Sequence, residues 1–204
     1  RNRGGSGRND REIAAFDELS RTWDNDYRIT RAKAIAGRIR RDVPFAASDS
    51  ILEFGCGTGL VSFNLLDLGA SFTLVDGSPG MSAVVAEKIR QSQTGKVTVI
   101  TGDLLSGQLP DGGFDVLFCS MALHHVVDLD AYGRKFHRLL ATGGRLCIVD
   151  LTEDDGTFHR DEPDFRGHNG FDPQKLSSRF AGLGFDPVSR EVPYSLFILV
   201  MRKA

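Results

Sequence analysis

The sequence lacks the features that mark several classes of protein. No two of its three cysteines form a C-x-x-C pair, so their spacing disfavours a zinc site and an iron–sulfur cluster. All three lie in apolar segments, and we expect reduced thiols in the core of a cytoplasmic protein. These cysteines are Cys56, Cys119 and Cys147. We predict that the chain holds no metal.

Long apolar runs and an excess of charge of either sign are also missing. Apolar runs such as Ser195 to Met201 are too short to cross a bilayer, and the chain begins with Arg and Gly rather than with an apolar signal core. The 25 basic and 27 acidic residues leave a formal net charge of -2, which gives no field that would gather nucleic acid. We therefore expect a soluble protein without a membrane span. Nucleic acid is not its favoured partner, and no obligate protein partner is indicated.

The remaining composition indicates one globular domain over residues 11–204, because a chain of 204 residues buries one core of ordinary size. Residues 1–10 have almost no apolar side chains, and we expect a disordered tail or a remnant added for expression. From Ile13 to Arg41, apolar residues recur at helical spacing on both sides of the turn-forming residues 24–26. This pattern predicts two helices ahead of the core.

Beyond Ser50, short apolar runs alternate with helical patterns, which is typical of a parallel sheet covered by helices. The strand candidates are Ile51 to Phe54, Phe72 to Val75, Val97 to Thr101, Val116 to Cys119 and Leu146 to Val149. The helix candidates are Leu60 to Leu68, Pro79 to Gln93, Leu129 to Leu140 and Pro173 to Leu183. We expect three glycines, Gly69, Gly143 and Gly184, to cap helix ends.

The last two strand candidates, Val188 to Val192 and Ser195 to Met201, are joined by only Pro193 and Tyr194. That link is too short for a helical crossover, so the two strands must pair antiparallel. The sequence therefore predicts an α/β fold with a mostly parallel, seven-stranded sheet that ends in an antiparallel hairpin.

Residues that can bind a nucleoside follow the first three predicted strands. A glycine-rich turn with Gly55, Gly57 and Gly59 comes directly after the first strand, where a ligand can touch the backbone because no Cβ intervenes. Asp76 ends the second strand, where a carboxylate can accept hydrogen bonds from the ribose hydroxyls of an adenosine. Asp103 supplies another carboxylate after the third strand.

These motifs, in this order, resemble the class I S-adenosylmethionine-dependent methyltransferases, especially the small-molecule branch that includes the ubiquinone and menaquinone C-methyltransferases. Their E/D-x-G-x-G-x-G motif is matched by Glu53 to Gly59, and the motifs together cover about half of the chain. A nicotinamide-dependent oxidoreductase is disfavoured, because Leu60 stands where the dehydrogenase fingerprint has Gly or Ala. The resemblance implies a Rossmann-like methyltransferase sandwich: residues 11–45 form a helical lid, 50–151 the cofactor-binding half and 152–204 the acceptor-side half.

The resemblance further implies that the glycines approach the methionine part and ribose, that Asp76 holds the ribose hydroxyls, and that Asp103 and Leu104 recognise the adenine. The full set of cofactor-binding residues that we predict is Trp23, Glu53, Gly55, Cys56, Gly57, Gly59, Asp76, Gly77, Ser78, Met81, Asp103, Leu104 and Cys119. For Trp23, packing of the N-terminal helices is an equal alternative to a place in the lid. Glu53 could also be a plain carboxylate at a strand end.

Three histidines are our candidates for a general base, since a histidine can take a proton from an attacking hydroxyl near neutral pH. His124 and His125 lie in the loop after the fourth strand. One of them could instead only close the cofactor pocket. His168 lies in the polar segment 158–171, where this fold binds acceptors; a mobile solvated loop is the alternative.

The sequence disfavours several acceptors. Methylation of exocyclic amines in DNA or of glutamine amides would require an N/D/S-P-P-Y/F element, and Cys119 to Ala122 stand in its place; cytosine C5 methylation would require a Cys next to Pro, which Cys119 lacks. A small organic acceptor with an O, S, N or activated C nucleophile is our hypothesis. The alternatives are a non-catalytic S-adenosylmethionine or S-adenosylhomocysteine-binding module and an RNA or protein methyltransferase. For RNA, six basic residues at helical spacing read instead as a solvated helix face: Arg28, Arg31, Lys33, Arg38, Arg40 and Arg41.

Overall fold

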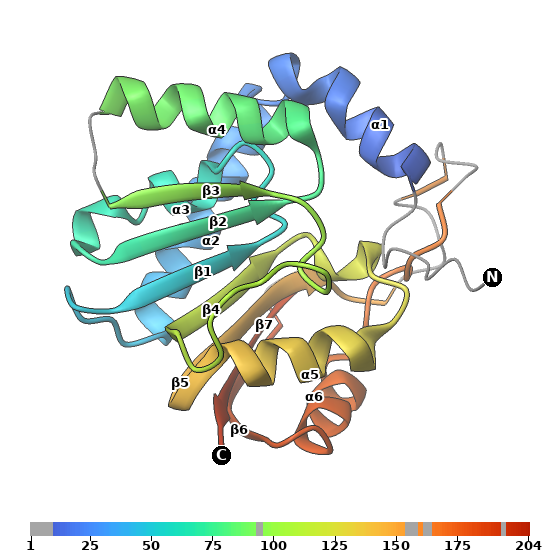
Figure 1. Cartoon of the computed structure of the whole chain (residues 1–204). Coiled ribbons are helices and arrows are strands. Elements are labelled where there is room, and N and C mark those ends of the chain that lie inside the picture. The colour runs from blue at the N-terminus through green and yellow to red at the C-terminus, as the bar shows by residue number, and fades with distance from the viewer. Residues whose placement is uncertain (1–9, 93–95, 154–158, 161–164, 193–194) are drawn as a thin grey trace.

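The computed structural model describes residues 10–92, 96–153, 159–160, 165–192 and 195–204 (Figure 1). The predicted tail therefore lies outside the described residues except for Asp10, which begins the first helix, and so do the two residues that join the last two strands.

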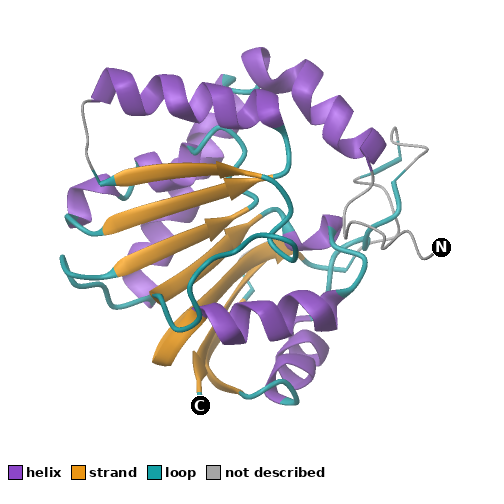
Figure 2. Cartoon of the chain, viewed as in Figure 1, coloured by secondary structure: helices purple, strands orange, loops and turns teal. Residues whose placement is uncertain are grey.

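Seven strands form one sheet in the order β3-β2-β1-β4-β5-β7-β6 (Figure 2). The strands are β1 (Ser50–Phe54), β2 (Ser71–Asp76), β3 (Val97–Thr101), β4 (Phe114–Ser120), β5 (Leu140–Leu151), β6 (Phe185–Glu191) and β7 (Leu196–Lys203). Strands β1 to β5 are parallel, and β7 runs antiparallel to both β5 and β6. The strand order reverses between β1 and β4, and such a switch point opens a crevice for ligands at the carboxyl ends of the strands. The predicted fold class and terminal hairpin are confirmed.

Helices cover both faces of the sheet, and Figure 1 shows α4 and α5 on opposite sides. The α-helices are α1 (Asp10–Leu19), α2 (Asp26–Asp42), α3 (Leu60–Phe63), α4 (Pro79–Ser92), α5 (Leu129–Leu139) and α6 (Pro173–Ala181). Three short 3-10 helices are η1 (Ser20–Thr22), η2 (Leu66–Leu68) and η3 (Leu123–His125).

Alternation along the strands divides the core into two clusters. Leu52 and Phe54 of β1 belong to the cluster that includes the buried residues of α5 and α6, whereas Ile51 belongs to the cluster that includes those of α2 and α3. Successive side chains of a strand point to opposite faces, so a strand covered on both sides must be apolar at nearly every position. Glu53 is an acidic exception to that rule within β1, and this residue belongs to the site described below.

Two predictions about helix ends are wrong. Gly143 does not cap a helix: α5 ends at Leu139, Leu140 already has extended backbone, and Gly143 lies inside β5 with a φ of 75°. The helix predicted over Leu60 to Leu68 is broken into α3 and η2. Gly69 does cap η2 with a φ of 76°, as predicted.

The N-terminal segment, comprising α1, η1 and α2, is fixed to the rest of the molecule by polar contacts. The Asp17 carboxylate accepts hydrogen bonds from the Ser78 hydroxyl (2.5 Å) and from the backbone N–H of Gly80 (2.7 Å), both at the start of α4. Asp24 accepts from the Thr58 hydroxyl at 2.5 Å and pairs with Lys88. The segment is thereby held over the glycine turn and the end of β2.

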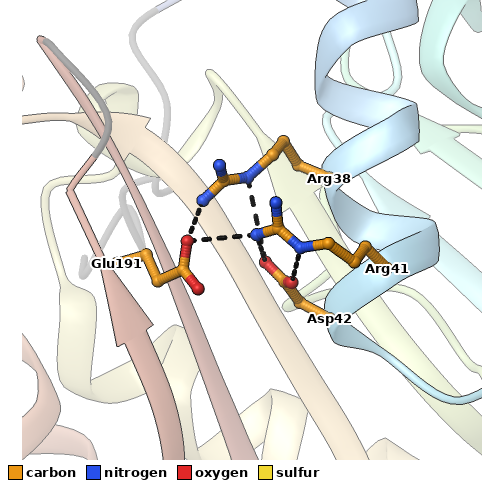
Figure 3. A network of polar contacts seen from close by, with 4 residues as sticks. All are labelled: Arg38, Arg41, Asp42 and Glu191. Atoms are coloured by element: carbon orange, nitrogen blue, oxygen red, sulfur yellow. Dashed lines mark hydrogen bonds and ion pairs between the residues drawn. The ribbon is translucent and has the colours of Figure 1, made fainter.

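At the far end of α2, four charged side chains join this helix to the end of β6 (Figure 3). Glu191 pairs with both Arg38 and Arg41, and Arg41 also pairs with Asp42 at 2.6 Å. The Arg41 and Glu191 side chains are about half exposed, so water screens this network. It links two elements that are distant in sequence without approaching the glycine turn.

Candidate active site

A cavity of about 680 Å³ opens at the carboxyl ends of the parallel strands, within the size range of small-molecule sites. Its floor comes from the turns after β1, β2 and β4, and the N-terminal segment closes one side with Phe16, Trp23 and Tyr27. The cavity therefore lies at the switch point of the sheet, as the fold predicts.

The glycine turn forms one wall of the cavity. Gly55, Gly57 and Gly59 have φ values of 68°, 55° and 80°, which L side chains rarely adopt. The turn is tied to β2, since the N–H of Gly55 donates to the Val75 carbonyl (2.8 Å) and the N–H of Gly57 donates to the Asp76 carboxylate (2.8 Å). Gly55 and Gly57 line the cavity, so a ligand can lie directly against their backbone.

Asp76 lies beside this turn and lines the cavity although it is only 5% exposed. Besides the Gly57 N–H, its carboxylate accepts the N–H of Ser78 at 2.9 Å. These bonds hold the carboxylate at the end of β2, where the sequence predicts a contact with ribose hydroxyls.

Glu53 is a carboxyl group buried among apolar neighbours, with an exposed fraction of 2%. The Ser62 hydroxyl donates to its Oε2 at 2.5 Å. Burial raises the pKa of Glu53 from 4.5 to about 8, and the nearby charge of Asp76 adds to the shift, while hydrogen bonds from Ser62 oppose it. Glu53 also lines the cavity, so a ligand with positive charge would meet a group that can ionise in response.

The other predicted cofactor residues divide into two sets. Trp23, Cys56 and Met81 line the cavity together with those above, whereas Gly59, Gly77, Ser78 and Cys119 do not. Asp103 and Leu104 do not line it either: the Asp103 carboxylate accepts from the Tyr132 hydroxyl at 2.7 Å, and Leu104 is buried in the core. Adenine recognition by these two residues stays a prediction. Burial raises the pKa of the Cys119 thiol well above its ordinary value, so it stays protonated.

On the opposite wall, His124 and Asp150 form a buried pair. The Nδ1 of His124 lies 2.6 Å from Asp150 Oδ1, and the two side chains are 2% and 0% exposed. The same carboxylate accepts the backbone N–H groups of His124 and Leu151, which fixes its position. A carboxylate beside Nδ1 favours the tautomer with hydrogen on that atom, which leaves Nε2 as an acceptor. His124 lines the cavity.

Further aromatic and titratable side chains surround this pair. The ring of His125 lies 4.1 Å from that of His124, and the ring of His159 lies 5.1 Å from it, measured between centroids. Phe165 stacks on His159 at 3.7 Å, and Phe16 of α1 meets His125 edge-on at 5.3 Å. We call the side chains of His124, His125, His159 and Phe165 the histidine wall. All four line the cavity.

His168 is not part of this wall. It lines a separate cavity of about 370 Å³ beside α6, and its backbone N–H donates to the His124 carbonyl at 2.7 Å. Burial lowers the pKa of His168. Because His168 does not line the larger cavity, its position does not support its predicted role as a base.

Sequence reasoning missed Asp150 and the part played by Glu12, whose carboxylate lies 3.9 Å from His125 Nδ1. Asp150 could have been found, because it stands near the carboxyl end of the fifth strand, where side chains of a parallel sheet meet ligands. Glu12 carries no such signal, since only the path of α1 brings it to the cavity.

Within the described part of the chain, no group of three His, Cys, Asp or Glu side chains is placed to hold a metal ion. None of the described helices has the length and apolarity of a membrane span.

Comparison with known proteins places this geometry in a family. Residues 52–148 match a family described as "Methyltransferase domain". The chain is 35% identical to an uncharacterised methyltransferase of Schizosaccharomyces pombe over 145 residues, 64% of this chain and 51% of that protein. It is also 35% identical to the mitochondrial ubiquinone biosynthesis O-methyltransferase of the same organism over 153 residues, 69% of this chain and 55% of that protein. The chain thus spans about half the length of these two relatives.

Among solved structures, an S-adenosylmethionine-dependent methyltransferase from Aquifex aeolicus superposes with a TM-score of 0.76 at 15% identity, covering 92% of this chain and 98% of that one. At that identity the likeness concerns the fold.

The residues around the glycine turn fit S-adenosylmethionine. The positive φ values leave backbone open to the ligand at Gly55 and Gly57, and a fixed carboxylate is available at Asp76. The glycine turn with Asp76, the family match and the relatives all indicate the same family of proteins. The chain belongs to the S-adenosylmethionine-dependent methyltransferases and has their Rossmann-like fold.

Proposed function

We propose that this protein methylates a hydroxyl group of a small organic molecule. The observation that carries the proposal is the buried His124–Asp150 pair on the wall of the cavity. An O-methyltransferase has to remove a proton from a weakly acidic acceptor, and a histidine oriented by a carboxylate is suited to that task. Three of the curated relatives are named as O-methyltransferases of ubiquinone biosynthesis, which supports an oxygen acceptor.

The cofactor, when bound, supplies a methyl group on a sulfonium that is already electrophilic. The protein has then to hold the reactants in line and exclude water. Gly55, Gly57 and Asp76 would hold the nucleoside and methionine parts against the turn, and Met81 would pack beside them. Phe16 and Trp23 of the N-terminal segment would cover the cavity and keep solvent out.

His124 would accept the proton of the acceptor hydroxyl on Nε2. The Asp150 carboxylate lies on the other side of the ring and would stabilise the imidazolium that results. Burial of both groups strengthens this interaction, because little water is present to screen it. Acceptor oxygen and base would therefore meet at the histidine wall.

The shape of this wall favours a flat acceptor. Phe165 and His159 stack in parallel, and Phe16 presents its face or edge to the rings around it. An aromatic ring can pack among such side chains in stacked or edge-on geometry. We therefore propose a hydroxylated aromatic compound, small enough to share a cavity of about 680 Å³ with the cofactor.

The test is methyl transfer from S-adenosylmethionine to a panel of phenols and catechols, followed by mass spectrometry of the product and of S-adenosylhomocysteine. With an accepted substrate, His124→Ala should lower kcat by about 100-fold or more, while binding of S-adenosylhomocysteine stays within twofold of wild type. His137→Gln is the matched control, since His137 lies on α5 and does not line the cavity.

Two results would contradict the proposal. Unchanged turnover in His124→Ala would show that His124 is not the base. Methylation only at nitrogen or sulfur across a wider panel would show that the acceptor atom is not a hydroxyl oxygen. Tight cofactor binding without transfer to any acceptor would instead favour the non-catalytic binding module.

A further inference from the structure

The segment 165–171 lies directly against the backbone of His124. The N–H of His168 donates to the His124 carbonyl at 2.7 Å, and the His168 ring forms a hydrogen bond with the backbone of Val126. Both of these backbone groups belong to the short turn that η3 and its C-terminal cap form after β4. His168 therefore holds this turn at two points, one on each side of His125.

Gly167 makes this close approach possible. A Cβ on Gly167 would overlap the carbonyl oxygen of His124 and would lie 3.0 Å from its carbonyl carbon, which is closer than packed atoms come. The same Cβ would lie 2.8 Å from the ring of Phe165. A flexible side chain can move aside, but the His124 carbonyl is part of the main chain. A side chain at position 167 would therefore push the turn and the segment apart.

The other end of the segment is fixed to the end of β5, the strand that carries Asp150. The N–H of Phe171 donates to the Leu151 carbonyl, and the Phe171 carbonyl accepts the N–H of Glu153, both at 2.9 Å. Asp150 itself contacts His124 at Nδ1 (2.6 Å) and at the backbone N–H (3.2 Å). The ring, the N–H and the carbonyl of His124 are thus all tied to the end of β5, either directly or through the segment.

We propose that Gly167 and His168 are positioning residues that hold His124 where it can accept the proton of the acceptor. A base must lie within hydrogen-bond reach of that proton, and a displacement of about 1 Å can lower a rate by about 100-fold. Asp150 orients the ring, and the contact with the segment places the backbone that carries the ring. The inference rests on the proposed function, in which His124 is the base. It gives His168 a role through its contacts with the turn and not as a base.

The first experiment adds one methyl group at the point of contact and compares two acceptors. In Gly167→Ala, kcat for a phenol that is neutral at the assay pH should fall by about 10- to 100-fold, with S-adenosylhomocysteine affinity within about twofold of wild type. A phenol that is already ionised at that pH needs no base, so its loss should stay below about threefold. Gly37→Ala is the matched control, because it adds the same methyl group at an exposed position of α2 with nothing within 4 Å. It should leave both rates unchanged.

A double-mutant cycle tests whether Gly167 acts through His124. Residues that act as one unit have effects that do not add, so Gly167→Ala should lower kcat by less than about twofold when His124→Ala is already present. A loss of full size in that background would show that Gly167 shapes the cavity and does not position the base.

His168→Ala is a milder variant, which keeps the inference testable if Gly167→Ala does not fold. It removes the hydrogen bond from the ring to Val126 and keeps the N–H that donates to His124. For the neutral phenol, kcat should fall by about two- to tenfold, the range for one hydrogen bond. The rate with the ionised phenol should not change.

Nuclear magnetic resonance of the histidine rings gives a measurement that needs no turnover. The chain has five histidines, so single substitutions can assign the signals of the ring nitrogens. In Gly167→Ala, the signals of His124 should shift, because its ring moves relative to Asp150. The signals of His137, which lies on α5 and does not line the cavity, should stay in place.

Three outcomes would overturn the inference. The first is an unchanged kcat for the neutral phenol in both Gly167→Ala and His168→Ala. The second is an equal loss for the two phenols, which would show that the segment only shapes the acceptor site. The third is an unchanged set of His124 signals in Gly167→Ala. If His124→Ala keeps full turnover, the proposed function loses its base, and the His124 signals still decide whether the segment positions this residue.

Discussion

The two walls of the cavity are built in different ways. The glycine turn, Glu53 and Asp76 come from one stretch of β1, turn and β2, and backbone hydrogen bonds such as Gly55 to Val75 hold them together. The histidine wall combines His124 and His125, which follow β4, with His159 and Phe165 from the segment after β5. Asp150 of β5 pairs with His124, and Glu12 of α1 approaches His125.

This difference shows which half of the site can vary. A wall made from backbone and two acidic side chains accepts few substitutions, because each glycine is required by its dihedral angles. A wall made from side chains on loops can change its chemistry without altering the sheet. The first wall therefore suits a ligand shared by the whole family, and the second suits an acceptor that differs among its members.

The largest expected effect tests whether the histidine wall is catalytic. Asp150→Asn keeps the shape of the side chain but no longer favours hydrogen on Nδ1 of His124, so Nε2 ceases to be a reliable acceptor. We expect kcat for a hydroxyl acceptor to fall by about 100-fold or more, with S-adenosylhomocysteine affinity within twofold of wild type. Asp186→Asn, at an exposed position of β6, is the control. A parallel loss of cofactor affinity would show that the two walls are not separate.

The next effect tests the opposite wall. Asp76→Ala removes a carboxylate that accepts from Gly57 and Ser78 and that we propose to bind the ribose. Calorimetry should show affinity for S-adenosylhomocysteine lowered by about 10- to 100-fold. Asp67→Ala, on the exposed side of η2, should change nothing at the cavity. Normal affinity in Asp76→Ala would move ribose recognition to another residue.

The two walls of the cavity also differ in how much of their structure could be predicted from the sequence. The motif over Glu53 to Gly59 and the position of Asp76 are local, so the strand, the turn and their contact could be read directly. The His124–Asp150 pair depends on the parallel register that places Ser120 opposite Val149, which no local pattern encodes. Arg28 was misread for the same reason: helical spacing separates polar from apolar faces but does not show that a cavity borders the polar one.

A smaller effect concerns the buried carboxyl of the first wall. Glu53 has a pKa of about 8 in the folded chain against an ordinary value of 4.5, so folding favours its protonated form. Its stabilising contribution is full below pH 4.5 and is lost as the pH rises to about 8. Glu53→Gln cannot ionise, and its stability relative to wild type should increase by about 1.4 kcal/mol per pH unit between pH 6 and 7. Urea unfolding at both pH values measures this gap; a constant gap would contradict the buried, protonated carboxyl.

The smallest effect separates the cavity from the surface contacts of the same helix. Arg28 and Arg31 lie on the half of α2 that borders the cavity, whereas Arg38 and Arg41 on the other half pair with Glu191 (Figure 3). Because Arg41 and Glu191 are about half exposed, Glu191→Gln should lower the free energy of unfolding by less than about 1 kcal/mol, and less still at high salt. Cofactor affinity should not change. A weaker affinity in this variant would mean that the surface ion pairs, and not the contacts of Trp23 and Asp24 beside the glycine turn, hold α2 in the position that the cavity requires.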